Sequence, residues 1–380
     1  MKKIAVVLDS NVRNNQEVII GLCDELNKHN TWDFQVLSHQ LPCSSIRTAF
    51  EKFMPDAIVV RNLQPELSAY LESLQLPYVV VADEGPSAKN ASVVTQDSHL
   101  IGEMAASYLR DQKFHYFGHI VNKSIKQSIR SKAYIEKIQK SKQPVYTFEL
   151  ENNSLIDHPF YEYQNATGLI SWLKKLPKPC GIFCHSDQLA LYVARTCHFH
   201  KISIPCEISL LGVDNDTLFC QLTKPHLASI YVSYRRIGIE AAKIINKWKP
   251  GRLLARIPPS TVVERGSCLP PLRSEPLIDS ALDYIRRHSA NGLRVSDLLK
   301  LTGLSPNQLT YRFQLATGRS PKEMILNQRI QDAKLLLADT SHSVVEVGHQ
   351  CGFKSASQFF VIFKDRMGIT PSRYRQQFLK

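Results

Sequence analysis

Four aspartates follow predicted strands in the first two thirds of the chain, where they could bind the hydroxyl groups of a ligand. They are Asp9, Asp97, Asp187 and Asp214. A polyol in a desolvated cleft needs charge-assisted hydrogen bonds, each worth about twice the ~1 kcal/mol of a neutral one. An aspartate after a strand can equally be a helix N-cap or a turn residue. Its repetition at four strand ends favours a binding site.

A second set of polar side chains lies near the C-terminus, with a spacing that suits contact with DNA bases. In the helix predicted after Pro306, Leu309 and Phe313 are spaced i, i+4 and must face a core. Amide and guanidinium groups left on the other side can bond base edges bidentately. The predicted DNA-contacting residues here are Ser305, Asn307, Gln308, Tyr311 and Arg312.

A further helix near residue 360 repeats this division. Phe359 and Phe363 should face the core, which leaves Ser355, Ala356, Gln358, Phe360 and Lys364 more exposed. Apolar contact with thymine methyl groups, or contact with phosphates alone, is the alternative to polar base readout by this helix. Any of the polar residues in either helix could instead be a surface side chain with no partner.

The elements that must position the aspartates alternate between strand and helix, as in a parallel sheet covered by crossover helices. The predicted strands are residues 3–8, 57–60, 78–81, 116–121, 181–184 and 208–213; the predicted helices are 17–28, 98–110, 129–140, 162–174 and 188–197. These are too many units for one small sheet, so we expect two sheets facing a cleft, with the ligand at the carboxyl ends of the strands.

A proline-rich segment, residues 266–276, can hold neither helix nor strand and predicts a linker. It separates a sensor domain, residues 1–265, from an all-helical domain, residues 277–380. The latter contains two copies of a short helix, a glycine terminator (Gly303, Gly352) and a serine-capped second helix, which is the pattern of a helix-turn-helix. A continuous amphipathic helix over residues 321–338 separates the copies.

The segment GIFCHSDQLALYVARTCHFHKISIPCEISLLGVDND, followed by KPHLASIYVSYRRIGIEAAKII, resembles the effector domain of the LacI family. The resemblance covers roughly residues 3–265 and implies a two-lobed, periplasmic-binding-protein-like fold. It implies sugar contacts at Asp97, Arg130, Ser186, Asp187 and Asp214, and Ser186 stands where the family often has Asn. Arg130 could instead be a solvated cation, although a guanidinium fork suits adjacent hydroxyl groups.

The C-terminal domain is similar to the DNA-binding domain of the AraC family. The family signature is matched at Gly352-Phe353, Ser357, Phe359, Phe363-Lys364, Gly368, Thr370-Pro371 and Tyr374-Arg375. Phe360 and Val361 depart from the small polar or basic residues usual in the family. Residues 1–60 hold no helix-turn-helix pattern, so we expect the C-terminal domain to bind the DNA.

Charge and composition agree with this assignment. The formal net charge is +13, and residues 270–380 hold 16 Lys and Arg against 9 Asp and Glu, as expected of a segment that meets a polyanion. A solvated basic face would give the same count. The N-terminus lacks a signal-peptide core, and the nine irregularly spaced cysteines fit a reducing compartment, so we expect a cytoplasmic protein without a membrane partner.

Enzyme and metal sites are disfavoured by the motifs. No G-x-S-x-G, P-loop or H-E-x-x-H is present, and Cys197, His198 and His200, or Cys180 with Cys184, match no closed zinc site. We therefore expect no catalysis, no metal and no cofactor. A plain sugar-binding protein would lack residues 277–380.

The combined architecture resembles bacterial activators of sugar catabolism. It implies D-xylose or a related sugar as effector, promoter DNA and RNA polymerase as partners, and a homodimer.

Overall fold

The computed structural model describes residues 2–28, 32–61, 63–82, 91–123, 128–150, 164, 166–248, 252–268, 276–340 and 342–377. The chain forms two compact units. The first unit consists of residues 1–101, 128–130 and 232–259, and the second consists of residues 102–127, 131–231 and 260–380. Each unit contains one six-stranded sheet, which confirms the predicted two sheets and adds strands that were not predicted.

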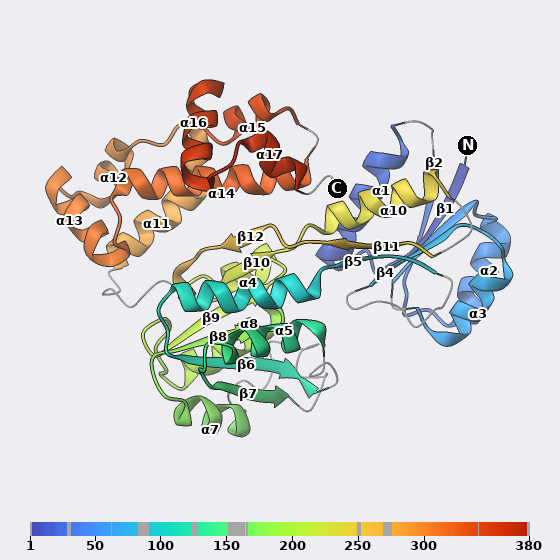
Figure 1. The fold of residues 1–380 in the computed structure, drawn as a ribbon, viewed down its shortest axis with the longest axis horizontal. Coiled ribbons are helices and arrows are strands. Elements are labelled where there is room, and N and C mark those ends of the chain that lie inside the picture. The colour runs from blue at the N-terminus through green and yellow to red at the C-terminus, as the bar shows by residue number, and fades with distance from the viewer. Residues whose placement is uncertain are drawn as a thin grey trace. The chain divides into compact units, whose positions relative to one another are not determined.

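The sheet of the first unit is entirely parallel. Its order is β11-β5-β4-β3-β1-β2 (Figure 1). The strands are β1 (Lys2–Val7), β2 (Trp32–Leu37), β3 (Ala57–Val60), β4 (Tyr78–Ala82), β5 (Ser92–Gln96) and β11 (Leu254–Ile257). Every residue of β3 and β5 is buried, because helices cover both faces of a parallel sheet. The helices are α1 (Arg13–Leu26), α2 (Cys43–Phe53), α3 (Pro65–Ser73) and α10 (Tyr234–Asn246).

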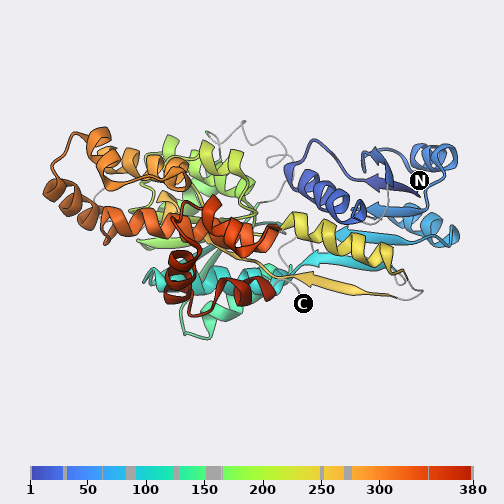
Figure 2. The same cartoon turned by 90° about the horizontal axis from the view of Figure 1, so that it is seen from above.

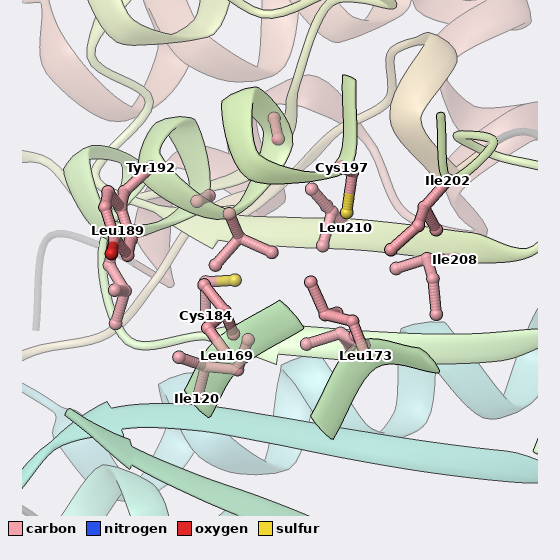
Figure 3. Packing of buried hydrophobic residues seen from close by; sticks show 14 of the residues in the cluster. Ile120, Leu169, Leu173, Cys184, Leu189, Tyr192, Cys197, Ile202, Ile208 and Leu210 are labelled. Carbon is pink, nitrogen blue, oxygen red and sulfur yellow. The ribbon is translucent and has the colours of Figure 1, made fainter. Parts of the chain in front are cut away.

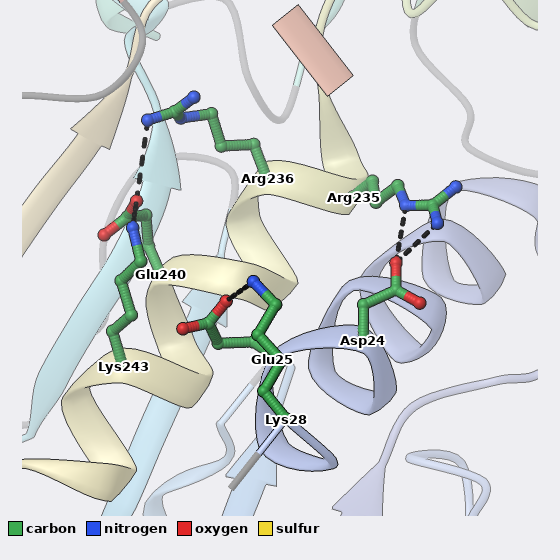
Figure 4. Close-up of polar contacts among 7 residues, drawn as sticks. All are labelled: Asp24, Glu25, Lys28, Arg235, Arg236, Glu240 and Lys243. Carbon is green, nitrogen blue, oxygen red and sulfur yellow. Dashed lines mark hydrogen bonds and ion pairs between the residues drawn. The ribbon is translucent and has the colours of Figure 1, made fainter. Parts of the chain in front are cut away.

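Helices α1 and α10 cross closely because each has a glycine at the crossing. A Cβ added to Gly21 would lie 1.9 Å from the Arg235 carbonyl oxygen, and one added to Gly238 would lie 2.0 Å from that of Val18. At the edge of this contact Arg235 donates two hydrogen bonds to Asp24 (Figure 4). The crossing joins the start of the chain to a segment more than two hundred residues later, so the first unit is closed by long-range packing.

The sheet of the second unit has the order β12-β10-β9-β8-β6-β7, and only its edge strand β12 is antiparallel. The strands are β6 (Tyr116–Asn122), β7 (Val145–Leu150), β8 (Cys180–Cys184), β9 (Ile208–Val213), β10 (Ala228–Tyr231) and β12 (Thr261–Val263). The helices around it are α4 (Ser98–Asp111), α5 (Ile129–Gln139), α7 (Thr167–Lys175), α8 (Asp187–Phe199) and α9 (Thr217–Leu222). Part of the helix predicted over 162–174 lies outside the described residues.

The core of this sheet is a cluster of aliphatic side chains and cysteines (Figure 3). Burial raises the pKa of Cys180 and of Cys197 to about 12, so both thiols stay protonated. They pack as small apolar side chains, in agreement with the prediction that they fill the core. No group of three His, Cys, Asp or Glu is placed to hold a metal ion in the described part of the chain.

The C-terminal domain is all-helical, as expected. Its elements are α11 (Pro276–His288), α12 (Val295–Thr302), α13 (Pro306–Thr317), α14 (Pro321–Asp339), α15 (Val344–Gln350), α16 (Ala356–Met367) and α17 (Pro371–Gln376), with 3-10 turns at Gly266–Cys268 and Ser289–Asn291. The turn at Gly266–Cys268 lies in the segment expected to have no helix. In Figures 1 and 2, α14 runs between α11–α13 and α15–α17. It supplies Ile325 to one core and Leu337 to the other, so a single rod joins two small helix-turn-helix cores.

Candidate functional site

The loop after β9 has a strained backbone. Asp214 has a φ of 100° and Asn215 a φ of 54°, in the region that non-glycine residues rarely adopt. Each such residue costs on the order of 1 to 3 kcal/mol and persists only where its surroundings hold it. Such strain is typical of loops that bind ligands. It persists here because neighbouring side chains hold the loop in place.

Three side chains hold the loop. The Asp187 carboxylate, at the start of α8, accepts hydrogen bonds from the Ser229 hydroxyl (2.6 Å) and the Asp216 amide (2.7 Å). The Ser229 hydroxyl in turn accepts a hydrogen bond from the Asn215 amide (3.0 Å). The third is Arg265, which donates to the Asn215 side-chain oxygen (2.6 Å) and to the Leu227 carbonyl (2.8 Å). Adjacent peptide groups of residues 215 and 216 are therefore fixed from two directions.

Burial gives Asp187 a structural role in this arrangement. Its side chain is 1% exposed, and desolvation, reinforced by the nearby Asp214 carboxyl, raises its pKa well above the usual range. The hydrogen bonds from Ser229 and Asp216 oppose that rise. Gly212 permits this packing, since a Cβ there would lie 2.1 Å from an Asp187 oxygen. Asp187 thus positions the loop that carries Asp214, and a direct ligand contact by Asp187 stays a prediction.

Ser186 also has a local structural function. Its hydroxyl accepts a hydrogen bond from the Leu189 amide (3.3 Å) and caps α8. The cap places Asp187 in the first turn of the helix. Among the predicted ligand residues of the second unit, Ser186 and Asp187 are adjacent on α8, and Asp187 interacts with Asp214 across the sheet end.

The remaining predicted ligand residues belong to the first unit. Asp9, 6% exposed, accepts hydrogen bonds from Ser38 and from Gln40 (3.2 Å), which follow β2. Asp97 accepts a hydrogen bond from the Leu100 amide (3.0 Å), so it has the N-cap role that the sequence left open. Arg130 lies near the start of α5 and is 3% exposed, which excludes the solvated surface cation considered as the alternative.

Sequence reasoning missed Ser229 and Arg265. Ser229 is a fully buried polar residue in β10, a strand that was not among those predicted. A polar residue within a recognised strand would have been a signal for an internal hydrogen bond. Arg265 lies 50 residues from its Asn215 partner, and nothing local in the sequence marks it.

The first helix predicted to contact DNA, α13, begins at a capping box. The Ser305 hydroxyl accepts a hydrogen bond from the Gln308 amide, and the Gln308 side chain accepts one from the Ser305 amide (3.1 Å). The predicted base-reading amide of Gln308 is therefore engaged in the cap. Leu309 and Phe313 are fully buried, as predicted, and Tyr311 is 65% exposed. Asn307 is exposed and Arg312 half-buried on the same helix.

The second helix predicted to contact DNA, α16, has the predicted core residues Phe359 and Phe363, both fully buried. Phe360 is half-buried against this core and so more exposed than Phe359 and Phe363, as predicted, and Val361 is 68% exposed. Ser355 caps the helix, and Gln358 accepts a hydrogen bond from the Lys354 amide (3.2 Å). The remaining predicted contacts are Ala356, half-buried, and Lys364, exposed.

Comparisons with known proteins match both halves of the chain. A family of periplasmic binding protein-like domains matches residues 106–268, and a helix-turn-helix domain family matches residues 298–377. The chain is therefore a DNA-binding transcription regulator with a periplasmic-binding-protein-like sensor, and not an enzyme. No described helix has the length and apolarity to cross a bilayer.

Individual relatives and solved structures are similar to the chain over 70% or more of its length. It is homologous to the xylose operon regulatory protein of Haemophilus influenzae, with 28% identity covering 98% of each chain. That of Escherichia coli K12 is 24% identical over 98% of this chain and 96% of its own. The solved structure of a xylose-binding transcription activator has the same fold, with a TM-score of 0.59 and 23% identity over 99% and 98% of the two chains. A LacI family regulator from Enterococcus faecium with bound ribose matches 70% of this chain and 98% of its own, at 18% identity and a TM-score of 0.57.

Proposed function

We propose that this chain is a cytoplasmic, D-xylose-dependent activator of xylose catabolism genes that acts as a homodimer and recruits RNA polymerase. The observation that carries the proposal is homology over 98% of the chain to xylose operon regulatory proteins, sensor and DNA-binding domain together. The strained loop at the end of β9 supports a ligand site in the sensor. The exposed polar side of α13 supports DNA contact.

Sugar recognition centres, in this proposal, on the Asp214 carboxylate at the strained loop. It accepts hydrogen bonds from two sugar hydroxyl groups, while Asp9, Asp97, Arg130, Ser186 and Asp187 supply or position the other polar groups. Hydrogen bonds to charged groups contribute about 1.5 to 3 kcal/mol each, so the loss of one weakens binding at least tenfold. The sugar shifts the regulator only by its different affinity for two conformations.

The DNA-binding domain contacts residues 260 and 261, the segment through which a conformational change in the sensor could be transmitted to that domain. The chain returns to the second unit for the last time at Ser260. The Tyr374 hydroxyl of α17 donates to the Ser260 carbonyl (3.2 Å), and the Lys334 amine of α14 donates to the Thr261 hydroxyl. Thr261 also donates to the Gln331 side chain (3.4 Å). A displacement of residues 260 and 261 would therefore be transmitted to α14, the helix between the two helix-turn-helix units, α11–α13 and α15–α17.

We propose that both helix-turn-helix units contact the same face of duplex DNA. At about 1.5 Å per residue, the 19 residues of α14 span roughly 28 Å, close to the ~34 Å helical repeat of DNA. Asn307, Gln308, Tyr311 and Arg312 in α13 then approach one major groove. Ser355, Ala356, Gln358 and Lys364 in α16 approach the next, with Val361 available to contact a thymine methyl group.

Isothermal titration calorimetry of the full chain tests the sugar assignment. D-xylose should bind, whereas D-ribose, L-arabinose and D-glucose should bind at least tenfold more weakly. Asp214→Ala should abolish the xylose heat without lowering the melting temperature. If another pentose binds and D-xylose does not, the sugar assignment is wrong.

A regulator of the same architecture with another sugar as effector is the second candidate. The likeness in fold to a LacI family structure with bound ribose favours ribose for this alternative. The same titration separates the two, because the preferred sugar gives the tighter binding.

A further inference from the structure

A cavity of about 250 Å³ lies within the second unit, between the end of the sensor and the DNA-binding domain. The sensor contributes Glu264 and Arg265, and the DNA-binding domain contributes residues of α11, α14 and the end of α16. Its cationic lining residues are Arg265, Arg286, Arg319, Lys334 and Arg366, and Glu264 is its one acidic lining residue among those that the structure describes. The lining therefore has a large excess of positive charge.

Three of these cations have partners. Arg265 is bound to Asn215 and the Leu227 carbonyl, and Arg286 forms an ion pair with Asp283. Arg319 lies 3.6 Å from Glu264, with both side chains partly exposed. An exposed pair of this kind is weak, commonly below about 1 kcal/mol, so Arg319 can change partner at little cost.

Lys334 is the cation that the fold leaves least compensated. The residue is 9% exposed, and its amine donates one of its three possible hydrogen bonds to Thr261. Within the described ranges neither Lys334 nor Arg366 forms an ion pair within 4 Å, although Arg366 is close enough to Glu323 to help lower the pKa of that carboxyl. Burial lowers the pKa of Lys334 to about 8, and the charge of Glu264 only partly offsets that shift. A buried cation without a paired anion costs free energy that a bound anion would recover.

The remaining lining suits an oxyanion. Asn327, Gln328 and Gln331 of α14 add amide groups to the charged ones, and amides donate to phosphate oxygens. A water occupies about 30 Å³ in the liquid, so the cavity has room for a tetrahedral phosphate and several waters. Arginine and lysine around a phosphate form short charge-assisted hydrogen bonds, stronger than those between neutral groups.

We propose that this cavity binds a phosphate group, as inorganic phosphate or a small phosphate monoester, between Lys334, Arg319 and Arg366. Arg319 follows α13, Lys334 lies in α14 and Arg366 lies near the end of α16. One anion would therefore link both helix-turn-helix units to α14, the helix that connects them. The regulator would then respond to a phosphorylated metabolite separately from its sugar. This site goes beyond the proposed function and does not depend on it.

The first test is thermal unfolding of the full chain in potassium phosphate and in potassium chloride at equal ionic strength, with and without D-xylose. Phosphate in the millimolar range should raise the melting temperature by several degrees more than chloride does. Glucose 6-phosphate, used as the monoester probe, should act in the same direction. Equal effects of phosphate and chloride would overturn the proposal.

Two variants localise the effect. Arg366→Gln changes an exposed side chain that should not disturb folding, and Lys334→Met removes the buried cation. Each should weaken phosphate binding on the order of tenfold by calorimetry, because each removes a charge-assisted hydrogen bond. Lys322→Met, which removes an exposed cation of α14 outside the cavity, should leave it unchanged. Retention of full phosphate affinity by both Arg366→Gln and Lys334→Met would show that the anion binds elsewhere.

DNA is the other source of phosphate, and a third measurement separates it. Phosphate affinity should be the same for the free chain and for the chain bound to a promoter duplex at constant ionic strength. If the duplex excludes phosphate from the cavity, the ligand is the DNA backbone and the small-molecule proposal fails. A normal xylose heat in Arg366→Gln would show that such a failure leaves the sugar-sensing proposal intact.

Discussion

Ser229 in β10 and Asp187, which follows β8, are joined by a hydrogen bond of 2.6 Å, and both side chains are buried. The same Ser229 hydroxyl accepts the Asn215 amide, so one side chain links the buried carboxylate to the strained loop. The loop that presents Asp214 is therefore held by residues that need not touch a ligand. This separation between positioning and contacting residues yields distinct expectations for their variants.

Ser229→Ala should destabilise the chain and weaken sugar binding together. The change leaves the Asn215 amide without its acceptor and the Asp187 carboxylate with one donor fewer, at a cost of about 1 to 3 kcal/mol. Urea unfolding and calorimetry measure the two effects. Ser45→Ala, at an exposed serine of α2, is the matched control and should change neither. Wild-type stability in Ser229→Ala would mean that the loop is held by other contacts.

Asp214→Gly should separate stability from function. Glycine adopts a φ of 100° without a Cβ clash, which recovers strain of on the order of 1 to 3 kcal/mol against about 0.5 to 1 kcal/mol of added chain entropy. The free energy of unfolding should rise by about 1 kcal/mol, while xylose affinity is lost with the carboxylate. A variant that binds xylose as the wild type does would remove Asp214 from the site.

Lys334→Met should stabilise the chain in a pH-dependent manner. The pKa of Lys334 is about 8 in the folded chain and near 10.4 in an unfolded one. Below pH 8 both states are charged and the folded state bears the full cost of burial. Between pH 8 and about 10.4 only the folded state loses its proton, so wild-type stability recovers as the pH rises.

The Met variant should therefore gain about 1 to 2 kcal/mol at pH 7, and the gain should shrink towards pH 10. Urea unfolding of both proteins at pH 7 and pH 9.5 measures this. A variant that is less stable than the wild type at pH 7 would show that the Thr261 hydrogen bond outweighs the cost of the buried charge.

Arg312→Ala should weaken promoter binding by about 1 to 3 kcal/mol and relax the preference at one base position. Fluorescence anisotropy gives the affinity, and selection from a randomised duplex gives the preference. Lys52→Ala in α2 of the sensor removes the same charge far along the chain and should have no effect on either. A uniform loss across all sequences would assign Arg312 to the phosphate backbone.

The sequence predicted best those features that depend on local spacing. The i, i+4 pairs Leu309 with Phe313 and Phe359 with Phe363 are buried as expected, because a helix period alone determines their common face. Phe360 is more exposed than these residues, as expected, but helix period alone did not predict its contact with the edge of the small core. The two sheets followed from the number of strand and helix units.

Long-range hydrogen bonding could not be predicted. The hydrogen bonds of Asp187 with Ser229 and Asp216, which lie 42 and 29 residues away, have no local signal in the sequence. Arg265 stood next to the expected linker and had no local feature that marked it as a loop support. Such partners are determined only when the strand order brings β8, β9 and β10 together.

The DNA affinity of the full chain with and without D-xylose tests the central claim most directly. Anisotropy titration of a labelled duplex from a xylose gene promoter, at fixed salt, should show binding at least five to ten times tighter with xylose, the ordinary range for coupling between two sites. A random duplex should show no such change. Equal affinity for both duplexes, or no response to any pentose, would contradict the account of a sugar-responsive regulator.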